Sequence, residues 1–567
     1  MIDLSLDVPA AGAGAGVDPE LLTPDNAEDF NPGDVRTLAR DGFLNLVGVA
    51  LYGICNFALV VIITRKLGAT GAGAFLEAVA LFSILTKASL LGADLGLLRF
   101  IARFRALDRN HDVRRTLAIA IIPVALVSAV AGLAMFLLAN RLGGLLSAGS
   151  GREVLSTYLR VMAPFVPIGA VYQALEGGSR GFGTMLPGVT IERIARPLLT
   201  PALVWIVLSS GLGATAIALA WAGPVALALL PMVWWTLVLV RRIERGSRQL
   251  AASDAGDSTA ASPATAATTP RELSREFWRF SSPRALGGVF QIGIIWLDSL
   301  LIGALGSTRQ AGIYAATTRW LIVGTFAGQA ITMAFGPQIS FVLARADVGR
   351  AGKLYQTATV WLMALAFPAY ITTMVFAPLL LGVFGRGFGS GATSLIILGA
   401  ANLFAAACGP VDVVLLMAGR SGLSLVNNGI ALSANVGLNL LLIPRYGING
   451  AAIAWAASLF ITNAFPLVQV WRSPGVHPFG RGWATILGLS VACVAGVQVV
   501  VRLLLGSTLT ALVVAIVATA ALYGLALHRY RDALDVRALT NGWRTRRAAR
   551  SADVQNVILT PDPSGGH

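Results

Sequence analysis

Residues 67–85 read LGATGAGAFLEAVALFSIL, and residues 305–323 read LGSTRQAGIYAATTRWLIV. Both stretches begin with Leu-Gly and enter a long apolar run, and they lie 238 positions apart. A second pair, GATAIALAW from Gly213 and GAAIAW from Gly450, is separated by nearly the same interval. The sequence therefore predicts a duplicated helical unit. Duplicated halves with a substrate path between them are typical of alternating-access transporters.

The composition indicates that lipid surrounds most of this chain. Of its 567 residues 56% are hydrophobic and 13% are charged, whereas soluble domains carry about 25% charged residues. A helix needs about 20 apolar residues to cross a bilayer. We therefore expect an all-α integral membrane protein of about 14 transmembrane helices, with two pseudo-symmetric six-helix lobes and two additional C-terminal helices.

The apolar runs set the expected boundaries. They are residues 43–64, 74–102, 116–139, 157–177, 186–209, 213–240, 281–304, 311–342, 356–384, 391–417, 422–443, 449–470, 483–505 and 508–527. The expected divisions are a disordered acidic cytoplasmic tail (1–40), an N-terminal lobe (41–240), a cytoplasmic linker (241–276), a C-terminal lobe (277–471), two additional transmembrane helices (472–527) and a basic cytoplasmic tail (528–567).

The basic residues predict the orientation. With the N-terminus in the cytoplasm, 29 Lys and Arg fall in inside segments, 8 in outside gaps and 6 within spans. This bias is typical of a multi-pass protein with both termini cytoplasmic. Because the net charge of +15 is spread over the gaps between spans, it does not indicate a nucleic-acid partner.

The sequence lacks the residue patterns that disulfide frameworks, metal centres and catalytic sites require. The three cysteines lie far apart inside apolar runs, and the four histidines lie outside such runs. We therefore expect no disulfide framework, no metal centre and no cofactor. The outside gaps are short and the linker is low in complexity, without Asp-x-Asp or a Gly-rich phosphate loop with Lys. A membrane glycosyltransferase is thus a distant alternative, and we expect no enzyme and no catalytic residues.

Three stretches, together with the repeat, carry a family resemblance. They are LG-x-x-G-x-G from Leu67, LGADLGLLRFIARF at 91–104 and WLDSLLIGALGSTRQAGIYAA at 296–316. Over about residues 40–527 the chain resembles the polysaccharide flippase family of the multidrug/oligosaccharidyl-lipid/polysaccharide (MOP) exporter superfamily.

The resemblance implies a function in building the cell envelope. It implies a monomer with a V-shaped cavity between two lobes, in the bacterial cytoplasmic membrane. The implied substrate is an undecaprenyl-pyrophosphate-linked sugar repeat or a related polysaccharide precursor, as in lipopolysaccharide biosynthesis. Envelope glycan polymerisation or assembly proteins are the implied partners. A lipid-linked peptidoglycan precursor flippase and a multidrug or cation exporter of the same superfamily are the alternatives.

Charged residues inside the apolar runs are candidates for the substrate cavity, because a charge at membrane depth needs a partner or water. Lys87 and Asp94 are seven residues apart on one helix face, as a cavity-lining pair or as a structural pair between helices. Glu192 and Arg196 have the i,i+4 spacing of a salt bridge. This leaves Arg193 either to bind a pyrophosphate or to reach lipid headgroups.

Asp298 and Arg319 lie on neighbouring predicted helices. We expect them to form a structural ion pair, with Asp298 also a candidate for binding a coupling ion, as is Asp94. Arg319 is in addition a cavity candidate. Asn45, Tyr52 and Asn56 share one face of the first predicted helix and either bind sugar hydroxyls or join helices.

The repeat also predicts an uneven distribution of charge. Residues at the positions equivalent to Lys87 and Asp94 in the second half are Thr325 and Thr332. Cationic groups would then concentrate in the first lobe, which suits a substrate with one anionic end. Asn428, Asn435 and Asn439 form a further polar stripe, for which we favour helix-to-helix hydrogen bonding.

Overall fold

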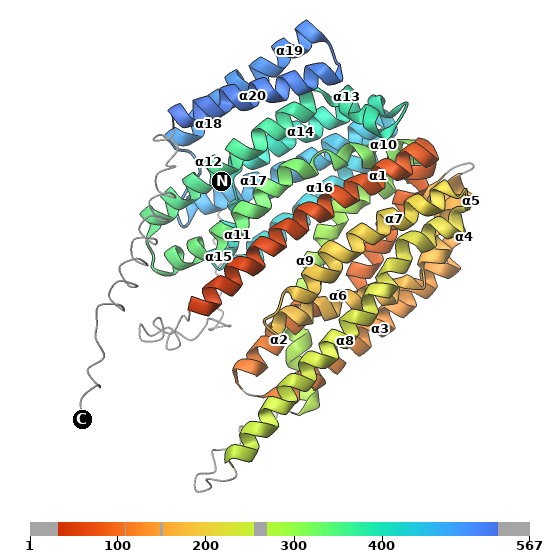
Figure 1. Cartoon of the computed structure of the whole chain (residues 1–567), viewed down its shortest axis with the longest axis vertical. Helices are drawn as coiled ribbons and strands as arrows, with labels where there is room; N and C mark the ends of the chain where they lie inside the picture. Colours follow the sequence, from red (N-terminus) through yellow and green to blue (C-terminus); the bar gives the residue numbers. More distant parts are fainter. Residues whose placement is uncertain (1–31, 108, 148–150, 255–268, 531–567) are drawn as a thin grey trace, which may run out of the picture.

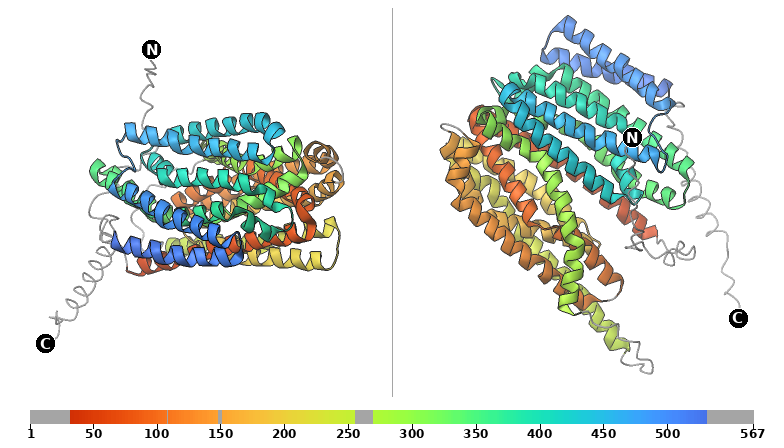
Figure 2. Two further views of the ribbon diagram at one scale, coloured as in Figure 1. Left: turned by 90° about the horizontal axis from the view of Figure 1, so that it is seen from above. Right: turned by 180° about the vertical axis from the view of Figure 1, so that it is seen from behind.

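The computed structural model describes residues 32–107, 109–147, 151–254 and 269–530. In these ranges the regular structure is helical throughout, which confirms the predicted all-α class. Figures 1 and 2 show most helices running side by side along one common direction.

The first half of the chain forms one group of helices. They are α1 (Pro32–Ser89), α2 (Ala93–Ala106), α3 (Asn110–Leu137), α4 (Ala139–Leu146), α5 (Gly151–Met162), α6 (Phe165–Gly181), the π-helical η3 (Gly188–Ala195), α7 (Arg196–Ser209) and α8 (Ala214–Asp254). Helices α2 and α3 pack on α6, which packs on α8, and α8 packs on α7. We call α2–α8 the first bundle (Figure 1).

The second half forms another group. Its helices are α9 (Pro270–Leu305), α10 (Thr308–Arg319), α11 (Ile322–Ala344), α12 (Val348–Val375), α13 (Ala377–Leu381), the 3-10 turns η4 (Gly382–Phe384) and η5 (Phe388–Gly391), α14 (Ala392–Cys408), α15 (Val411–Met417), α16 (Ser421–Tyr446), α17 (Ile448–Arg472), α18 (Arg481–Leu489), the π-helical η6 (Ser490–Gly496), α19 (Val497–Leu505) and α20 (Leu509–Arg529). We call α10–α17 the second bundle. Helices α18–α20 lie at its outer edge, where α18 and η6 pack against α12 (Figure 2).

The number of spans depends on how broken helices are counted. In the described ranges, ten helices are long and apolar enough to cross a membrane, or eleven if the bent pair α5 and α6 is one span. The other predicted runs coincide with interrupted helices. Gly68, with φ 67°, divides α1 into two helices, η3 precedes α7, and a turn separates α10 from α11. The structure is therefore consistent with the fourteen predicted runs without fixing that number.

Some helices extend into segments that the sequence predicted as tail or linker. Helix α1 begins at Pro32, and α8 and α9 reach Asp254 and Pro270. The expectation of non-helical structure is wrong at these edges, since the helices continue beyond the apolar runs. Thr269 begins α9 with a capping box, in which its side chain and that of Glu272 satisfy each other's backbone N–H groups. Most of the predicted acidic tail, the centre of the linker and nearly all of the basic tail lie outside the described residues.

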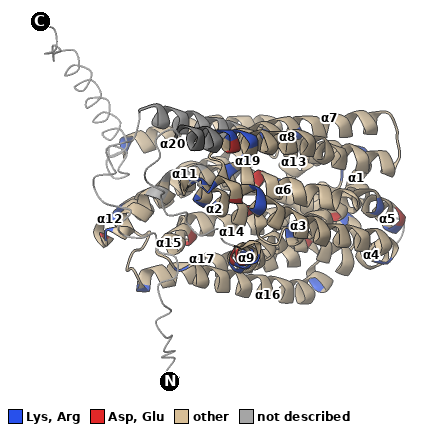
Figure 3. Cartoon of the chain, turned by 90° about the horizontal axis from the view of Figure 1, so that it is seen from below, with Lys and Arg blue, Asp and Glu red and all other residues tan. Residues whose placement is uncertain are grey.

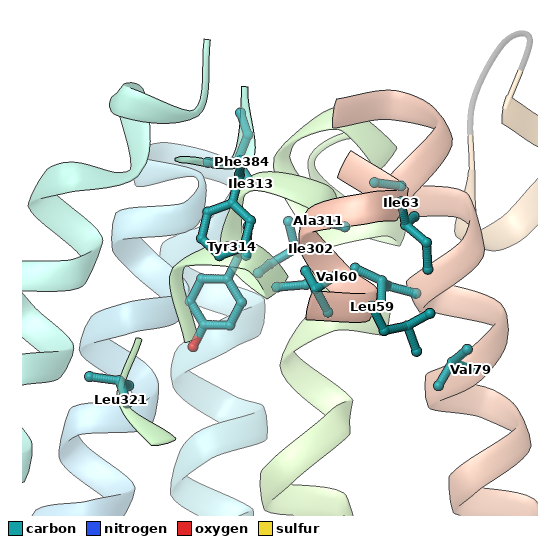
Figure 4. Packing of buried hydrophobic residues seen from close by; sticks show 14 of the residues in the cluster. Leu59, Val60, Ile63, Val79, Ile302, Ala311, Ile313, Tyr314, Leu321 and Phe384 are labelled. Atoms are coloured by element: carbon teal, nitrogen blue, oxygen red, sulfur yellow. The ribbon is translucent and has the colours of Figure 1, made fainter. Parts of the chain in front are cut away.

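Helices α1 and α9 join the two bundles. Helix α1 contacts α5 and α7 of the first bundle and α10 of the second bundle. Helix α9 contacts α2 of the first bundle and α10 and α16 of the second. Apolar side chains of both halves meet there, as Figure 4 shows for Leu59, Val60 and Ile63 of α1 and Ile302 of α9. Many large apolar side chains face outwards, including Leu503 and Leu504 at 79% and 78% exposure, as expected of helices surrounded by lipid.

The two copies of the repeated stretch touch at one end of the molecule. A Cβ atom at Gly73 would overlap with the carbonyl of Thr308, and one at Gly312 would overlap with the carbonyl of Ala69. The hydroxyls of Ser147 and Thr308 are hydrogen-bonded at 2.5 Å beside this contact. The small residues that open each copy thus allow backbone-to-backbone approach, and they close this end. We call it the closed end.

Candidate functional site

A cavity of about 270 Å³, which we call the first cavity, lies between the first bundle and helices α1, α9 and α10. Five of the eight predicted cavity residues line it, from the three helices α1, α7 and α10. They are Tyr52, Asn56, Lys87, Arg196 and Arg319. Its remaining polar lining comes from Ser83, Thr86, Gln173, Glu192 and Thr200, and its aromatic lining includes Trp221 and Trp296.

Lys87 and Asp94 form a salt bridge at the edge of this cavity. The Nζ atom of Lys87 lies 2.9 Å from Oδ2 of Asp94, and both side chains are largely buried. The helix breaks between them, with α1 ending at Ser89 and Gly92 adopting φ 73° before α2. Lys87 and Asp94 therefore meet across a turn between two helices. The prediction that they lie on one face of a continuous helix is wrong. The bond leaves Lys87 in the cavity wall, partly neutralised.

The segment η3–α7 directs two arginines to different places. Arg196 donates to both carboxylate oxygens of Glu192, at 2.7 and 2.8 Å, which confirms the predicted i,i+4 pair. Arg193 points elsewhere, because its Cβ lies 3.0 Å from the position that a Cβ of Gly48 would occupy. It lines a second cavity, and no salt bridge to it occurs among the described residues.

The second cavity has a volume of about 540 Å³ and lies in the second bundle. Thr325 and Thr332, the repeat equivalents of Lys87 and Asp94, both line it. Its charged residues are Arg193, which comes from the first bundle, and Asp412, which accepts a hydrogen bond from Ser424 at 2.7 Å. The second bundle thus contributes hydroxyls where the first half contributes the Lys87–Asp94 pair.

The predicted ion pair between Asp298 and Arg319 is wrong. Asp298 is 1% exposed and accepts hydrogen bonds from the Tyr314 hydroxyl at 3.0 Å and the Asn439 amide at 2.8 Å. Tyr314 and Arg319 are five residues apart on α10, which turns them about 140° from each other. Only one of them can face Asp298. The guanidinium of Arg319 lies instead over Trp296, 5.6 Å from the ring centroid, in the first cavity.

Two residues of the predicted asparagine stripe, Asn435 and Asn439 of α16, belong to the same buried network, whereas Asn428 does not. Asn439 donates to Oδ1 of Asn435 at 3.1 Å as well as to Asp298. The Oδ1 atom of Asn439 and the Nδ2 atom of Asn435 have no hydrogen-bond partner. These side chains connect α16 to α9, as favoured from the sequence. The side chain of Asn45, by contrast, lies outside the described part of the structure.

Sequence reasoning missed Glu77, although it stands within the repeated stretch. Its side chain is fully buried, and neither carboxylate oxygen has a hydrogen-bond partner. It packs against Gly303 of α9, where a Cβ would lie 2.7 Å from both the Glu77 carboxyl carbon and the Leu146 carbonyl oxygen. An acidic residue inside an apolar run was the available signal.

One of the three cationic side chains in the wall of the first cavity has no carboxylate partner among the described residues. Asp94 pairs with Lys87 and Glu192 pairs with Arg196. Arg319 has no carboxylate partner in the described ranges, and its Nε has no hydrogen-bond partner. A guanidinium in a mostly apolar, aromatic wall binds anions strongly, because little water competes. The arrangement can therefore hold an anionic group beside surfaces of hydroxyls, amides and aromatic rings.

Comparisons with known proteins agree with this architecture. A family model described as "Polysaccharide biosynthesis protein" matches residues 203–388, and the MatE family model matches residues 46–206. No curated protein matches the chain by sequence.

Solved structures share the fold at low sequence identity. The lipid II flippase MurJ, in an inward closed conformation, is 12% identical with a TM-score of 0.66, over 86% of this chain and 98% of that one. An inward-facing multidrug resistance MATE family transporter is 15% identical with a TM-score of 0.56, over 78% and 95%. A Vibrio cholerae MATE transporter is 16% identical with a TM-score of 0.53, over 77% and 98%. The apolar helices, the two partial family matches and this shared fold show that the chain is a multi-pass membrane protein with the fold of MOP-superfamily transporters and flippases.

Proposed function

We propose that this protein moves a lipid-linked oligosaccharide or polysaccharide precursor across the bacterial cytoplasmic membrane by alternating access. The observation that carries the proposal is the first cavity, whose wall holds Lys87, Arg196 and Arg319 but only one carboxylate, Glu192. A lipid-linked sugar has a phosphate or pyrophosphate group, and cationic residues in a partly dry cavity suit it. The protein acts as a transporter, so no catalytic residue is assigned.

The first cavity also has polar and aromatic groups that can bind the sugar part of the substrate. Tyr52, Asn56, Gln173 and Thr200 present hydroxyls and amides to the first cavity, and Trp221 adds an aromatic surface. Such groups hydrogen-bond sugar hydroxyls and stack on sugar rings. In the second cavity the threonines and Asn463 offer further hydrogen bonds. The anionic end of the substrate would then lie in the first bundle and its neutral glycan towards the second.

The closed end supports alternating access. Positive residues favour the opposite end as cytoplasmic, with both termini there, so that the cavities would load from the inner leaflet. Separation of Gly73 from Thr308 and of Gly312 from Ala69 would open the outer side. Because both contacts come from the repeat, one rocking motion of the halves breaks them together.

A coupling ion would bind at Asp298. Its carboxylate lies beside the unpartnered Oδ1 atom of Asn439, so that a proton or a small cation bound there gains oxygen partners in a buried place. Asp94 is the second candidate, and its bond to Lys87 makes any binding there dependent on that pair. The transporter is proposed to work as a monomer, with envelope glycan polymerisation or assembly proteins receiving the product.

Two other substrates remain as alternatives within the superfamily. A lipid-linked peptidoglycan precursor also has a pyrophosphate and sugars, and it fits the first cavity on the same grounds. A cationic drug would require more carboxylates than the cavity wall offers. The excess of cationic residues in the wall therefore favours either lipid-linked glycan over the drug.

The test is an analysis of lipid-linked glycans in a strain depleted of this protein. We expect a glycan-loaded polyprenyl lipid to accumulate on the inner leaflet, and its sugars separate the polysaccharide from the peptidoglycan precursor. Restoring the protein should clear the accumulated lipid. Unchanged lipid-linked glycans, combined with greater sensitivity to cationic drugs, would refute the proposal in favour of a drug exporter.

A further inference from the structure

Two arginines from different helices lie against the same phenylalanine, outside the first cavity. The Cζ atom of Arg99 on α2 lies 4.3 Å from the centroid of the Phe280 ring, and that of Arg284 on α9 lies 3.6 Å from it. Both arginines are exposed. Neither takes part in a salt bridge within the described ranges. Figure 3 shows charged residues gathered around α2 and α9.

The backbone holds the two arginines in this arrangement. A Cβ at Gly96 of α2 would lie 2.7 Å from the Phe277 ring, and one at Gly92 would overlap with the Ser281 carbonyl. These glycines let α2 approach the segment of α9 that carries Phe280. Arg284 also donates to the carbonyl of Phe280 at 3.0 Å. The positions of the two guanidinium groups therefore follow from close helix packing rather than from a carboxylate between them.

The positive charges of Arg99 and Arg284 lie close together without a carboxylate to neutralise them in the described part of the chain. The two guanidinium carbons are no farther apart than their combined distances to one ring, so the two positive charges repel each other. An aromatic face at an exposed site stabilises each cation only weakly and does not neutralise its charge. A phosphate group accepts hydrogen bonds from two planar guanidinium forks at once and removes the repulsion.

The pair leads towards the first cavity. Gly288 lies one helical turn after Arg284 on α9, and a Cβ there would stand 3.3 Å from Cε of Lys87. Lys87 in turn lines the first cavity, which also holds Arg196 and Arg319. Cationic side chains thus follow one another from the N-terminal half of α9 into the cavity.

From this arrangement we infer that Arg99 and Arg284 bind the phosphate of a membrane lipid, namely the pyrophosphate of the lipid-linked substrate before it reaches the first cavity. The inference rests on the proposed function. Bulk anionic phospholipid has the same phosphate chemistry and is the competing source. Because one arginine comes from each half of the chain, the bound phosphate would also join the two halves at this end.

The experiment measures lipid binding to the full-length protein in phosphatidylcholine nanodiscs by native mass spectrometry. The probes are undecaprenyl pyrophosphate and, separately, phosphatidylglycerol. The test variant combines Arg99→Gln with Arg284→Gln. The control variant combines Arg114→Gln with Arg279→Gln, which removes the same charge from exposed arginines of α3 and α9 that do not stack on Phe280.

We expect the test variant to bind undecaprenyl pyrophosphate at least tenfold more weakly than the wild type, and the control variant to bind it normally. Arg99→Lys with Arg284→Lys should bind with intermediate affinity, since lysine keeps the charge but loses the planar fork. Equal weakening for phosphatidylglycerol would assign the pair to bulk lipid and overturn the inference. Wild-type affinity in the test variant would also overturn it. If the wild-type protein itself fails to bind undecaprenyl pyrophosphate, the proposed function fails instead.

Discussion

Replacing Gly73 by alanine should open the closed end of this protein. A methyl group at Gly73 would stand 2.8 Å from the carbonyl carbon of Thr308 and 3.0 Å from the backbone nitrogen of Gly312. The same methyl group would overlap with the carbonyl oxygen of Thr308, and ordinary contacts between carbon atoms are about 3.5–4.0 Å, so the two backbones must separate by about 1 Å or more. Both are helix backbones, which cannot yield as the end of a flexible side chain can.

The size of the effect follows from the cost of overpacking. Extra methyl groups in a tightly packed place cost about 1–3 kcal/mol. This cost applies only while the bundles touch, because the contact is absent once they separate. Since about 1.4 kcal/mol changes an equilibrium constant tenfold, Gly73→Ala should shift the population away from the closed end by roughly 5- to 150-fold. Gly312→Ala, at the reciprocal contact, should act in the same direction.

Distances between spin labels measure this shift. Labels at Leu145 and Tyr446, both exposed near the closed end, report the separation of the two halves after Cys55, Cys408 and Cys493 are replaced by alanine. Gly213→Ala is the matched control, because a Cβ there meets no atom within 4 Å in a loop at the same end. The reasoning is refuted if Gly73→Ala gives the same distance distribution as Gly213→Ala.

Three further predictions concern charged and buried polar residues. Lys87→Ala and Arg193→Ala should each reduce substrate transport at least tenfold in reconstituted vesicles. Arg193→Ala should leave thermal unfolding nearly unchanged, because no salt bridge to Arg193 occurs in the described ranges. Full transport by both variants would remove the proposed role of cations. Asp298→Ala should destabilise the fold by roughly 2–5 kcal/mol, measured by thermal unfolding in detergent, because Tyr314 and Asn439 lose their buried acceptor. Glu77→Leu should be neutral or stabilise by roughly 1–4 kcal/mol in the same assay, since neither oxygen of Glu77 has a partner; clear destabilisation would indicate that this carboxylate binds an ion or a proton.

Contacts between neighbours in the sequence could be predicted from the sequence, whereas contacts between residues on different helices could not. Glu192 and Arg196 were paired correctly from their spacing, because i,i+4 neighbours on a helical segment face each other whatever surrounds them. Asp298 was assigned the wrong partner. Its neighbours come from α10 and α16, and which side chains meet there depends on how each helix is rotated about its axis. Sequence spacing within one helix contains no information on that rotation.

The amino-acid sequence by itself determined that the chain is a helical membrane protein, and it predicted that its halves are related and which charged residues stand at membrane depth. Hydrophobic run length, charge bias and internal similarity are properties of the chain that need no partner. Only the tertiary structure decided that the repeat copies touch through Gly73 and Gly312, that Arg193 and Arg196 serve different cavities, and that Arg99 and Arg284 share Phe280. Each of these depends on close approach between helices far apart in sequence, which is set by how breaks such as Gly68 and Gly92 redirect the chain.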